Sequence, residues 1–117
     1  MKVAIIDDER DMRLSISQWL SLSGYEPESF ASAEDALSTI SSNYPGVVVT
    51  DIKMPGMDGM QLLKKLMGQD SGLPVILITG HGDVPMAVEA MRLGAFNFLE
   101  KPFEPEDLTQ LIKLAAQ

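Results

Sequence analysis

Short apolar runs alternate with amphipathic segments along the whole chain. Residues 3–6, 47–50 and 73–79 form apolar runs of strand length, and the last of these is the most continuously apolar. Residues 25–30 and 95–99 complete a set of five predicted strands. The second of the five contains a proline, which cannot donate to a neighbouring strand, so we expect it at the edge of the sheet.

The segments between these runs carry apolar residues at helical spacing, so each predicts a helix with one buried face. Ser32, Asp58 and Asp83 stand where N-caps are expected, while Gly24 and Gly94 supply C-terminal stops and the last helix begins near residue 105. The residues expected to face inward are Met12, Ile16, Trp19 and Leu20; Ala33, Ala36, Leu37 and Ile40; Leu62, Leu63, Leu66 and Met67; Ala87, Val88 and Met91; and Leu108, Leu111, Ile112 and Ala115.

This alternation predicts an α/β protein. Continuous apolar strands separated by amphipathic helices indicate a doubly wound parallel sheet covered on both faces, here a single (βα)5 unit. Neither a repeat nor a linker interrupts residues 1–117, which we interpret as one domain. The last helix has no terminating glycine or proline, so we expect the domain to be the N-terminal part of a longer protein.

Composition narrows the possible functions. The chain contains no cysteine, which excludes disulfides and thiolate metal sites. No apolar run approaches the ~20 residues of a membrane span and no signal-peptide pattern is present, so we expect a cytoplasmic protein without membrane contact. The formal charge of −8, with only nine Lys and Arg in total, opposes direct binding of this domain to nucleic acid.

Polar residues follow four of the five predicted strands. Asp7 and Asp8 follow the first strand, Asp51 the third, Thr79 the fourth and Lys101 the fifth. In an open parallel sheet, ligands bind beyond the carboxyl ends of the strands. We therefore expect these five side chains to form one site.

The predicted site needs a cation. Two carboxylates ~4 Å apart repel by about 4 kcal/mol at an effective dielectric constant of ~20, and a nearby cation would offset that repulsion. Oxygen ligands without His or Cys favour Mg²⁺, with Mn²⁺ or Ca²⁺ as alternatives. Lys101 and the Thr79 hydroxyl suit a phosphoryl group, and the Asp51 carboxylate can act as the nucleophile of phosphoryl transfer.

Single acids near strand ends also have an ordinary structural interpretation as turn formers or helix caps. We assign Asp58 and Asp83 to that class, since each directly precedes a helix. Five independent turns would not produce one coherent phosphate site, so the same interpretation does not account for Asp7, Asp8, Asp51, Thr79 and Lys101 together.

Four motifs carry a family resemblance. They are Ile-Asp-Asp-Glu at residues 6–9, Asp-Ile-Lys-Met-Pro-Gly-Met-Asp-Gly at 51–59, Ile-Thr-Gly at 78–80 and Lys-Pro-Phe at 101–103. In this order and at this spacing, the chain resembles the receiver domain of two-component response regulators over its whole length. The resemblance implies the flavodoxin-like strand order 2-1-3-4-5.

Carried over to this chain, the resemblance implies that Asp51 accepts a phosphoryl group from a phosphohistidine on a sensor histidine kinase. Asp8 would bind Mg²⁺ directly and Asp7 mainly through water. Asp51 and the main-chain carbonyl of Lys53 would complete the protein ligands. The domain would catalyse only its own phosphorylation and dephosphorylation, so it is not an enzyme in the ordinary sense.

The resemblance also implies a switch. Thr79 would bind the phosphoryl group, Lys101 would pair with it, and the Lys101–Pro102 peptide bond is expected to be cis. Phe98 would fill the space that Thr79 vacates, with an ordinary core residue as the plain alternative. Lys53 and His81 would tune the phosphate lifetime, with a solvent-facing loop as the plain alternative for His81, the only histidine.

Residues 79–88 are similar to receivers of the dicarboxylate-transport regulators, which drive σ54-dependent transcription, and of the nitrogen-fixation regulators. That similarity implies an attached effector domain that regulates transcription, and a homodimer through the fourth helix and fifth strand or through the first and fifth helices.

Two other functions stay open on the residues alone. One is an aspartyl-phosphate phosphatase of haloacid-dehalogenase type, although in those enzymes the second acid lies two residues after the nucleophile, whereas Asp7 and Asp8 are adjacent here. The other is a flavodoxin-like flavin binder, although no hydroxyl- and Gly-rich phosphate loop follows the first strand.

Overall fold

The computed structural model describes residues 1–70, 72–80 and 82–117. The strands are β1 (Lys2–Ile6), β2 (Glu26–Phe30), β3 (Gly46–Asp51), β4 (Val75–Thr79) and β5 (Asn97–Glu100). The helices are α1 (Arg10–Leu22), α2 (Ala33–Thr39), α3 (Gly59–Gln69), α4 (Val84–Arg92) and α5 (Pro105–Ala115). Each predicted strand and helix is present, in the predicted order.

Two strands, β4 and β5, begin two residues later than predicted. β4 begins at Val75 because Pro74 before it has no N–H to donate to a neighbouring strand, and the N–H of Leu73 is already bonded to the carbonyl of Asp70. β5 begins at Asn97 because the N–H of Ala95 still bonds to the carbonyl of Ala90 at the end of α4. Residues 73 and 95 are nevertheless buried, which explains why the hydrophobic pattern extends the strands to them.

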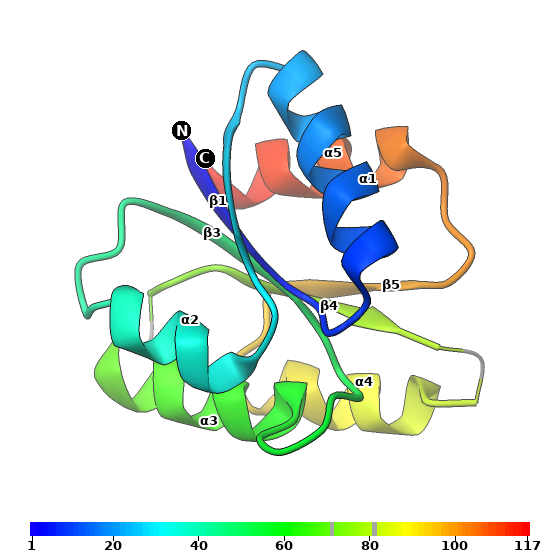
Figure 1. Ribbon diagram of the computed structural model, residues 1–117. Coiled ribbons are helices and arrows are strands. Elements are labelled where there is room, and N and C mark those ends of the chain that lie inside the picture. Colours follow the sequence, from blue (N-terminus) through cyan, green and yellow to red (C-terminus); the bar gives the residue numbers. More distant parts are fainter. Residues whose placement is uncertain (71, 81) are drawn as a thin grey trace.

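The sheet is fully parallel, with strand order β2-β1-β3-β4-β5, so the expected fold and order are confirmed (Figure 1). β2 lies at one edge, as its proline predicts. β1 and β3 lie in register, with Ile6 opposite Thr50, so the residues that follow β1 lie beside the end of β3.

Helices cover both faces of the sheet. Figure 1 shows α1 and α5 on one face and α2, α3 and α4 on the other. Each face has its own core: Ile16, Leu20, Leu108 and Ile112 pack against one side, while Leu62, Leu63, Leu66, Ala87 and Ala90 pack against the other. The strands are buried between the two cores, which is why they read as continuous apolar runs.

α4 differs from its predicted orientation. Ala87 and Ala90 are fully buried, as expected for residues three apart on one helix face, but Val88 and Met91 are 53% and 39% exposed. The prediction that Val88 and Met91 face inward is therefore wrong. The spacing of apolar residues does not reveal that the fully buried positions of this helix are Ala87 and Ala90, with Met86 packed partly buried beside them.

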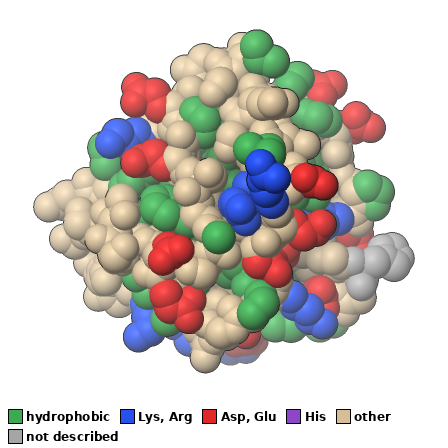
Figure 2. All heavy atoms as spheres, in the orientation of Figure 1, with side chains coloured by type: hydrophobic (Ala, Val, Ile, Leu, Met, Phe, Trp, Pro, Cys, Tyr) green, Lys and Arg blue, Asp and Glu red, His purple; other side chains and the backbone are tan. Residues whose placement is uncertain are grey.

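The surface agrees with the composition. Acidic and basic side chains are interspersed on the face drawn in Figure 2. In the part of the chain that the structure describes, none of the helices is both long and apolar enough to cross a membrane.

Candidate functional site

Three carboxylates lie together at the carboxyl ends of β1 and β3. Asp51 is the last residue of β3, and Asp7 and Asp8 directly follow β1. One carboxylate oxygen from each of the three lies within 4.8 Å of the others. Asp7 is 1% exposed and Asp51 9%, whereas Asp8 is open to solvent. The parallel register thus produces the cluster that the strand ends predict.

Asp7 is held with one oxygen paired and the other unpaired. Its Oδ1 accepts the backbone N–H of Glu9 at 2.9 Å, and its main-chain carbonyl accepts Nη1 of Arg13 at 2.7 Å. Its Oδ2 is buried and has no hydrogen-bond partner among the described residues. Burial raises the pKa of Asp7; the Glu9 N–H opposes that rise and the charge of Asp51 adds to it.

This arrangement fits a divalent cation. A buried carboxylate oxygen without a partner is costly, and two further carboxylates within 4.8 Å increase that cost. A cation between them would relieve both penalties. The donors are all hard oxygens, which suits Mg²⁺ or Mn²⁺ and does not suit metals that prefer nitrogen or sulfur.

Lys101 places a positive charge on the same cluster. Its Nζ donates to Oδ2 of Asp51 at 3.1 Å, and its backbone N–H donates to the carbonyl of Thr79 at 2.8 Å. Burial lowers the pKa of Lys101, but the hydrogen bond and the charge of Asp51, together with Asp7, outweigh burial and raise it. The peptide bond between Lys101 and Pro102 is cis.

Thr79 is the last residue of β4, and Phe98 lies on the neighbouring strand β5. The Thr79 side chain is fully buried, and its hydroxyl donates to the carbonyl of Gly80 at 3.3 Å. Phe98 is opposite Leu77 in the sheet and packs, partly buried, against the core beneath α4. The hydroxyl and the ring therefore lie on neighbouring strands, and the ring contacts the core that α4 shares.

The loop after Asp51 is shaped by its backbone. Gly56 has φ +74°, a conformation that favours glycine. Glu34 of α2 accepts the N–H of Met57 at 3.3 Å, and its carboxylate oxygen Oε2 is 2.9 Å from where a Cβ on Gly56 would be. Sequence reasoning missed Glu34, because nothing in the spacing of the chain links it to a loop more than twenty residues later.

The start of α3 packs against Asp51 itself. Asp58 accepts the N–H of Gln61 while Gln61 accepts the N–H of Asp58, a complete capping box, so the prediction that Asp58 caps a helix is confirmed. The next residue, Gly59, donates its N–H to the carbonyl of Ile52 at 2.7 Å. A Cβ there would overlap the main-chain oxygen of Asp51. Gly59 is therefore needed for the helix to approach the strand end.

Asp83 does not act as the predicted cap. It occupies the N-cap position of α4, but its side chain makes no capping hydrogen bond within the described residues. Its Oδ1 instead pairs with Nζ of Lys53 at 3.1 Å, so an ion pair has replaced the cap. His81, for which we predicted a role in phosphate lifetime, lies outside the described residues.

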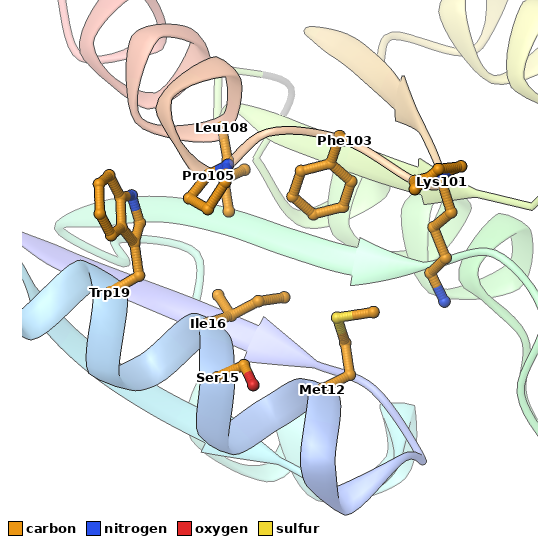
Figure 3. A pocket seen from close by; sticks show the side chains of 9 residues that line it. Met12, Ser15, Ile16, Trp19, Lys101, Phe103, Pro105 and Leu108 are labelled. Carbon is orange, nitrogen blue, oxygen red and sulfur yellow. The ribbon is translucent and has the colours of Figure 1, made fainter.

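A cavity of about 470 Å³ adjoins the cluster on the side of α1. Figure 3 shows Lys101 at one end of it and Trp19 at the other, with Met12, Ile16, Phe103 and Leu108 between them. Its lining is mostly apolar, and the Trp19 indole N–H is buried without an acceptor in the described part of the chain. The cavity therefore adds no charged group to the cluster besides Lys101.

A parallel five-stranded sheet with three acids and a lysine at its carboxyl edge defines a class of signalling domain. Residues 3–113 match the model of the response regulator receiver domain, and the chain belongs to that family. The predicted resemblance is confirmed.

Particular relatives narrow the class. The chain is 48% identical to the C4-dicarboxylate transport transcriptional regulatory protein DctD of Rhizobium meliloti over 98% of its own length and 25% of that protein. It is 46% identical to the transcriptional regulatory protein FixJ of Bradyrhizobium diazoefficiens over 97% of its length and 55% of that protein. The chain thus spans between about a quarter and about half of these two relatives.

A solved structure confirms the fold. The response regulator receiver domain protein from Clostridium thermocellum matches with a TM-score of 0.94 and 37% identity, over 98% of this chain and 93% of that one. Because receivers are signalling domains of response regulators, family membership favours the predicted receiver function over the haloacid-dehalogenase and flavin-binding alternatives.

Proposed function

We propose that this domain is a phosphorylation-activated switch in which Asp51 accepts a phosphoryl group from a phosphohistidine of a sensor histidine kinase. The observation that carries the proposal is the position of the Asp51 carboxylate. It ends a buried strand, lies within 4.8 Å of two other carboxylates, and is bonded to the Lys101 ammonium at 3.1 Å. Family membership supports the same function.

The transfer requires an oxygen of Asp51 to attack phosphorus. The new bond joins that oxygen to phosphorus as the bond between phosphorus and the donor histidine nitrogen breaks, and the electron pair leaves with the nitrogen. The Lys101 ammonium would donate hydrogen bonds to the phosphoryl oxygens and stabilise their negative charge in the transition state. The rigid strand end holds Asp51 in place for the attack.

Asp7, Asp8, Asp51 and the main-chain carbonyl of Lys53 would hold Mg²⁺, with Mn²⁺ as an alternative. Bound there, the ion would neutralise the carboxylates and the incoming phosphate. The unpaired Oδ2 of Asp7 supports this assignment, because it is buried beside two further acids and needs a positive partner.

Thr79 and Phe98 would carry the signal. In the unphosphorylated domain the Thr79 hydroxyl is bound to the carbonyl of Gly80, a weak contact at 3.3 Å that a charged phosphoryl oxygen would readily replace. Phe98 would then move into the space that Thr79 leaves. Its partly buried ring already packs against the core beneath α4, which supports a path from the phosphate to the outer surface of that helix.

The output would act on other chains and domains. Exposed apolar residues offer two faces for a homodimer: Val88, Met91 and Phe96 on α4 and just before β5, and Leu14, Leu22 and Leu114 on α1 and α5. Both relatives described above are named transcriptional regulators and are longer than this chain. We propose that residues 1–117 are the N-terminal domain of a cytoplasmic regulator of that kind, with contact to DNA left to an attached effector domain.

The test is phosphorylation by a small donor. We expect acetyl phosphate with Mg²⁺ to add one phosphoryl group to the intact protein, detected by mass spectrometry. The gain should disappear in Asp51→Asn and on chelation of the metal. Asp58→Asn is the matched control: it changes a nearby acid in the same way, but at a helix cap, and should leave the gain intact.

Two results would contradict the proposal. One is an equal mass gain in Asp51→Asn, which would place the phosphoryl group elsewhere. The other is continuous turnover of small phosphate esters, which would favour a phosphatase. Neither depends on knowing the partner kinase.

A further inference from the structure

Lys53 and Asp83 connect the phosphorylation loop to α4. Lys53 lies two residues after Asp51, and its Nζ is 3.1 Å from Oδ1 of Asp83. Asp83 stands at the N-cap position of α4, thirty residues later in the chain. This ion pair thus joins the site of chemistry to the helix whose outer face is a candidate output surface.

The two partners differ in freedom. The Lys53 side chain is 69% exposed, whereas that of Asp83 is 15% exposed. The other oxygen of Asp83 lies close over Gly80, 3.3 Å from where a Cβ on that glycine would be. Asp83 is therefore held against the β4–α4 connection, and Lys53 is the partner that can move away.

The Asp83 carboxylate makes no hydrogen bond within its own helix, in the part of the chain that the structure describes, but one donor there lies within its normal reach. An N-cap carboxylate normally accepts the N–H of the second or third helical residue. The second is Pro85, which has no N–H, and the third is Met86, whose N–H bonds to the Asp83 carbonyl at 3.0 Å. Release of Lys53 would let the Asp83 carboxylate replace the Asp83 carbonyl as the acceptor of the Met86 N–H and so cap α4, while that carbonyl keeps the N–H of Ala87 at 3.2 Å.

We propose that Asp83 is a positioning residue for Lys53: it retains the Lys53 ammonium on α4 in the unphosphorylated domain and releases it to the phosphoryl group, after which Asp83 caps α4. The proposal rests on phosphorylation of Asp51. A phosphoryl group brings a charge of about −1.5 to −2, more than the single charge of Asp83, so it competes effectively for an exposed lysine.

The exchange sets how long the phosphate lasts. In hydrolysis, a water oxygen bonds to phosphorus as the bond from phosphorus to the Asp51 oxygen breaks, releasing inorganic phosphate, a proton and the free carboxylate. A lysine held over the phosphoryl group obstructs that water. Asp83 competes for the same lysine, so it shortens the lifetime.

The first measurement is the half-life of the phosphorylated protein. After acetyl phosphate is removed, the loss of the phosphoryl group is monitored by intact-protein mass spectrometry. We expect Asp83→Asn to lengthen the half-life about threefold, because an ion pair with one exposed partner has only a modest free energy. The same substitution in a Lys53→Gln background should have no effect. Asn is as good an N-cap as Asp, so the variant keeps its helix start.

A control separates this effect from general charge. Asp107→Asn removes an acid from the first turn of α5, away from Lys53, and should leave the half-life unchanged. Asp83→Glu, which retains the carboxylate, should restore a half-life near that of the unchanged protein. A purely structural role for Asp83 would not give an effect that depends on Lys53.

A second measurement needs no phosphate. In Lys53→Gln, the Asp83 carboxylate is free to cap α4, so the Met86 amide proton should shift downfield in a ¹⁵N-correlated NMR spectrum. Equal half-lives in the unchanged protein and Asp83→Asn, a lengthening that persists without Lys53, or an unshifted Met86 amide would each overturn the proposal. Failure of the unchanged protein to accept phosphate would instead refute the proposed function, and the Met86 amide would still report on the ion pair.

Discussion

The end of β3 and the segment from α4 to β5 are separated by one strand of the sheet, β4, and differ in how far they are buried. β3 pairs with a strand on each side, and Val47 to Asp51 are all buried. β5 is an edge strand of four residues, none of them fully buried, and α4 exposes Val88 and Met91. One region is enclosed, and the other is half in solvent.

The difference separates two requirements of a switch. A nucleophile and its neighbouring acids must stay in fixed positions, which a central strand between two cores provides. An output surface must change at low cost, and regions with few buried apolar contacts are the ones that rearrange most easily. The Lys53–Asp83 ion pair joins the two regions, so a change at the first can reach the second.

The largest effect is expected where α3 meets the end of β3. Gly59→Ala would place a Cβ against the main chain of Asp51 and Ile52, which cannot move without disturbing the carboxylates, so we expect a loss of about 3 kcal/mol or more in unfolding free energy. Gly68→Ala, in the same helix, meets no described atom within 4 Å and should stabilise by about 0.5–1 kcal/mol. Urea denaturation of both variants measures the contrast; equal costs would mean that the contact at Gly59 is not rigid.

The enclosed region is also the part that sequence predicts well. Asp7, Asp8, Asp51 and Lys101 come together because parallel strands must end at one edge of the sheet, a rule that needs only the positions of the strands. The role of Gly59 could not be predicted in the same way. Its need depends on how closely α3 approaches Asp51, and that distance is set by packing.

A smaller effect separates the same substitution in the two regions. Val48 on β3 is fully buried and Val88 on α4 is 53% exposed. Val48→Ala should cost about 2 kcal/mol, because it removes buried methyl groups and leaves a cavity. Val88→Ala should change the unfolding free energy by less than about 0.5 kcal/mol, since little burial is lost and alanine favours a helix. Thermal and urea unfolding measure both; a similar cost at Val88 would mean that α4 is covered in solution.

Sequence predicts the half-exposed region less well. Val88 and Met91 fit an apolar stripe, but the fully buried residues of α4 are Ala87 and Ala90, and periodicity alone does not decide between these two rows. Asp83 fits an N-cap, but a lysine thirty residues earlier takes its carboxylate. Both errors concern a choice between two locally reasonable positions, which tertiary contacts decide.

The smallest effect is expected from Asp7→Asn without metal. Burial raises the pKa of Asp7 above its ordinary value of 3.8, so the folded domain holds the proton more tightly than the unfolded chain. The contribution of Asp7 to stability is therefore full below that value and is lost as pH rises through its raised pKa. Asn keeps the acceptor for the Glu9 N–H without the charge, so the variant should melt a few degrees higher at pH 7 and show little difference near pH 3.8.

Mg²⁺ should reverse the order of the two melting temperatures, so melting both proteins with and without the ion tests the proposed metal site. The unchanged protein gains stability with the logarithm of the Mg²⁺ concentration relative to its Kd, whereas Asp7→Asn has lost one of three charges that favour binding. At saturating Mg²⁺ the unchanged protein should melt above the variant. If the variant stays above it at every Mg²⁺ concentration, Asp7 does not share a cation with Asp8 and Asp51, and its buried charge is a cost of the enclosed strand end that the metal does not relieve.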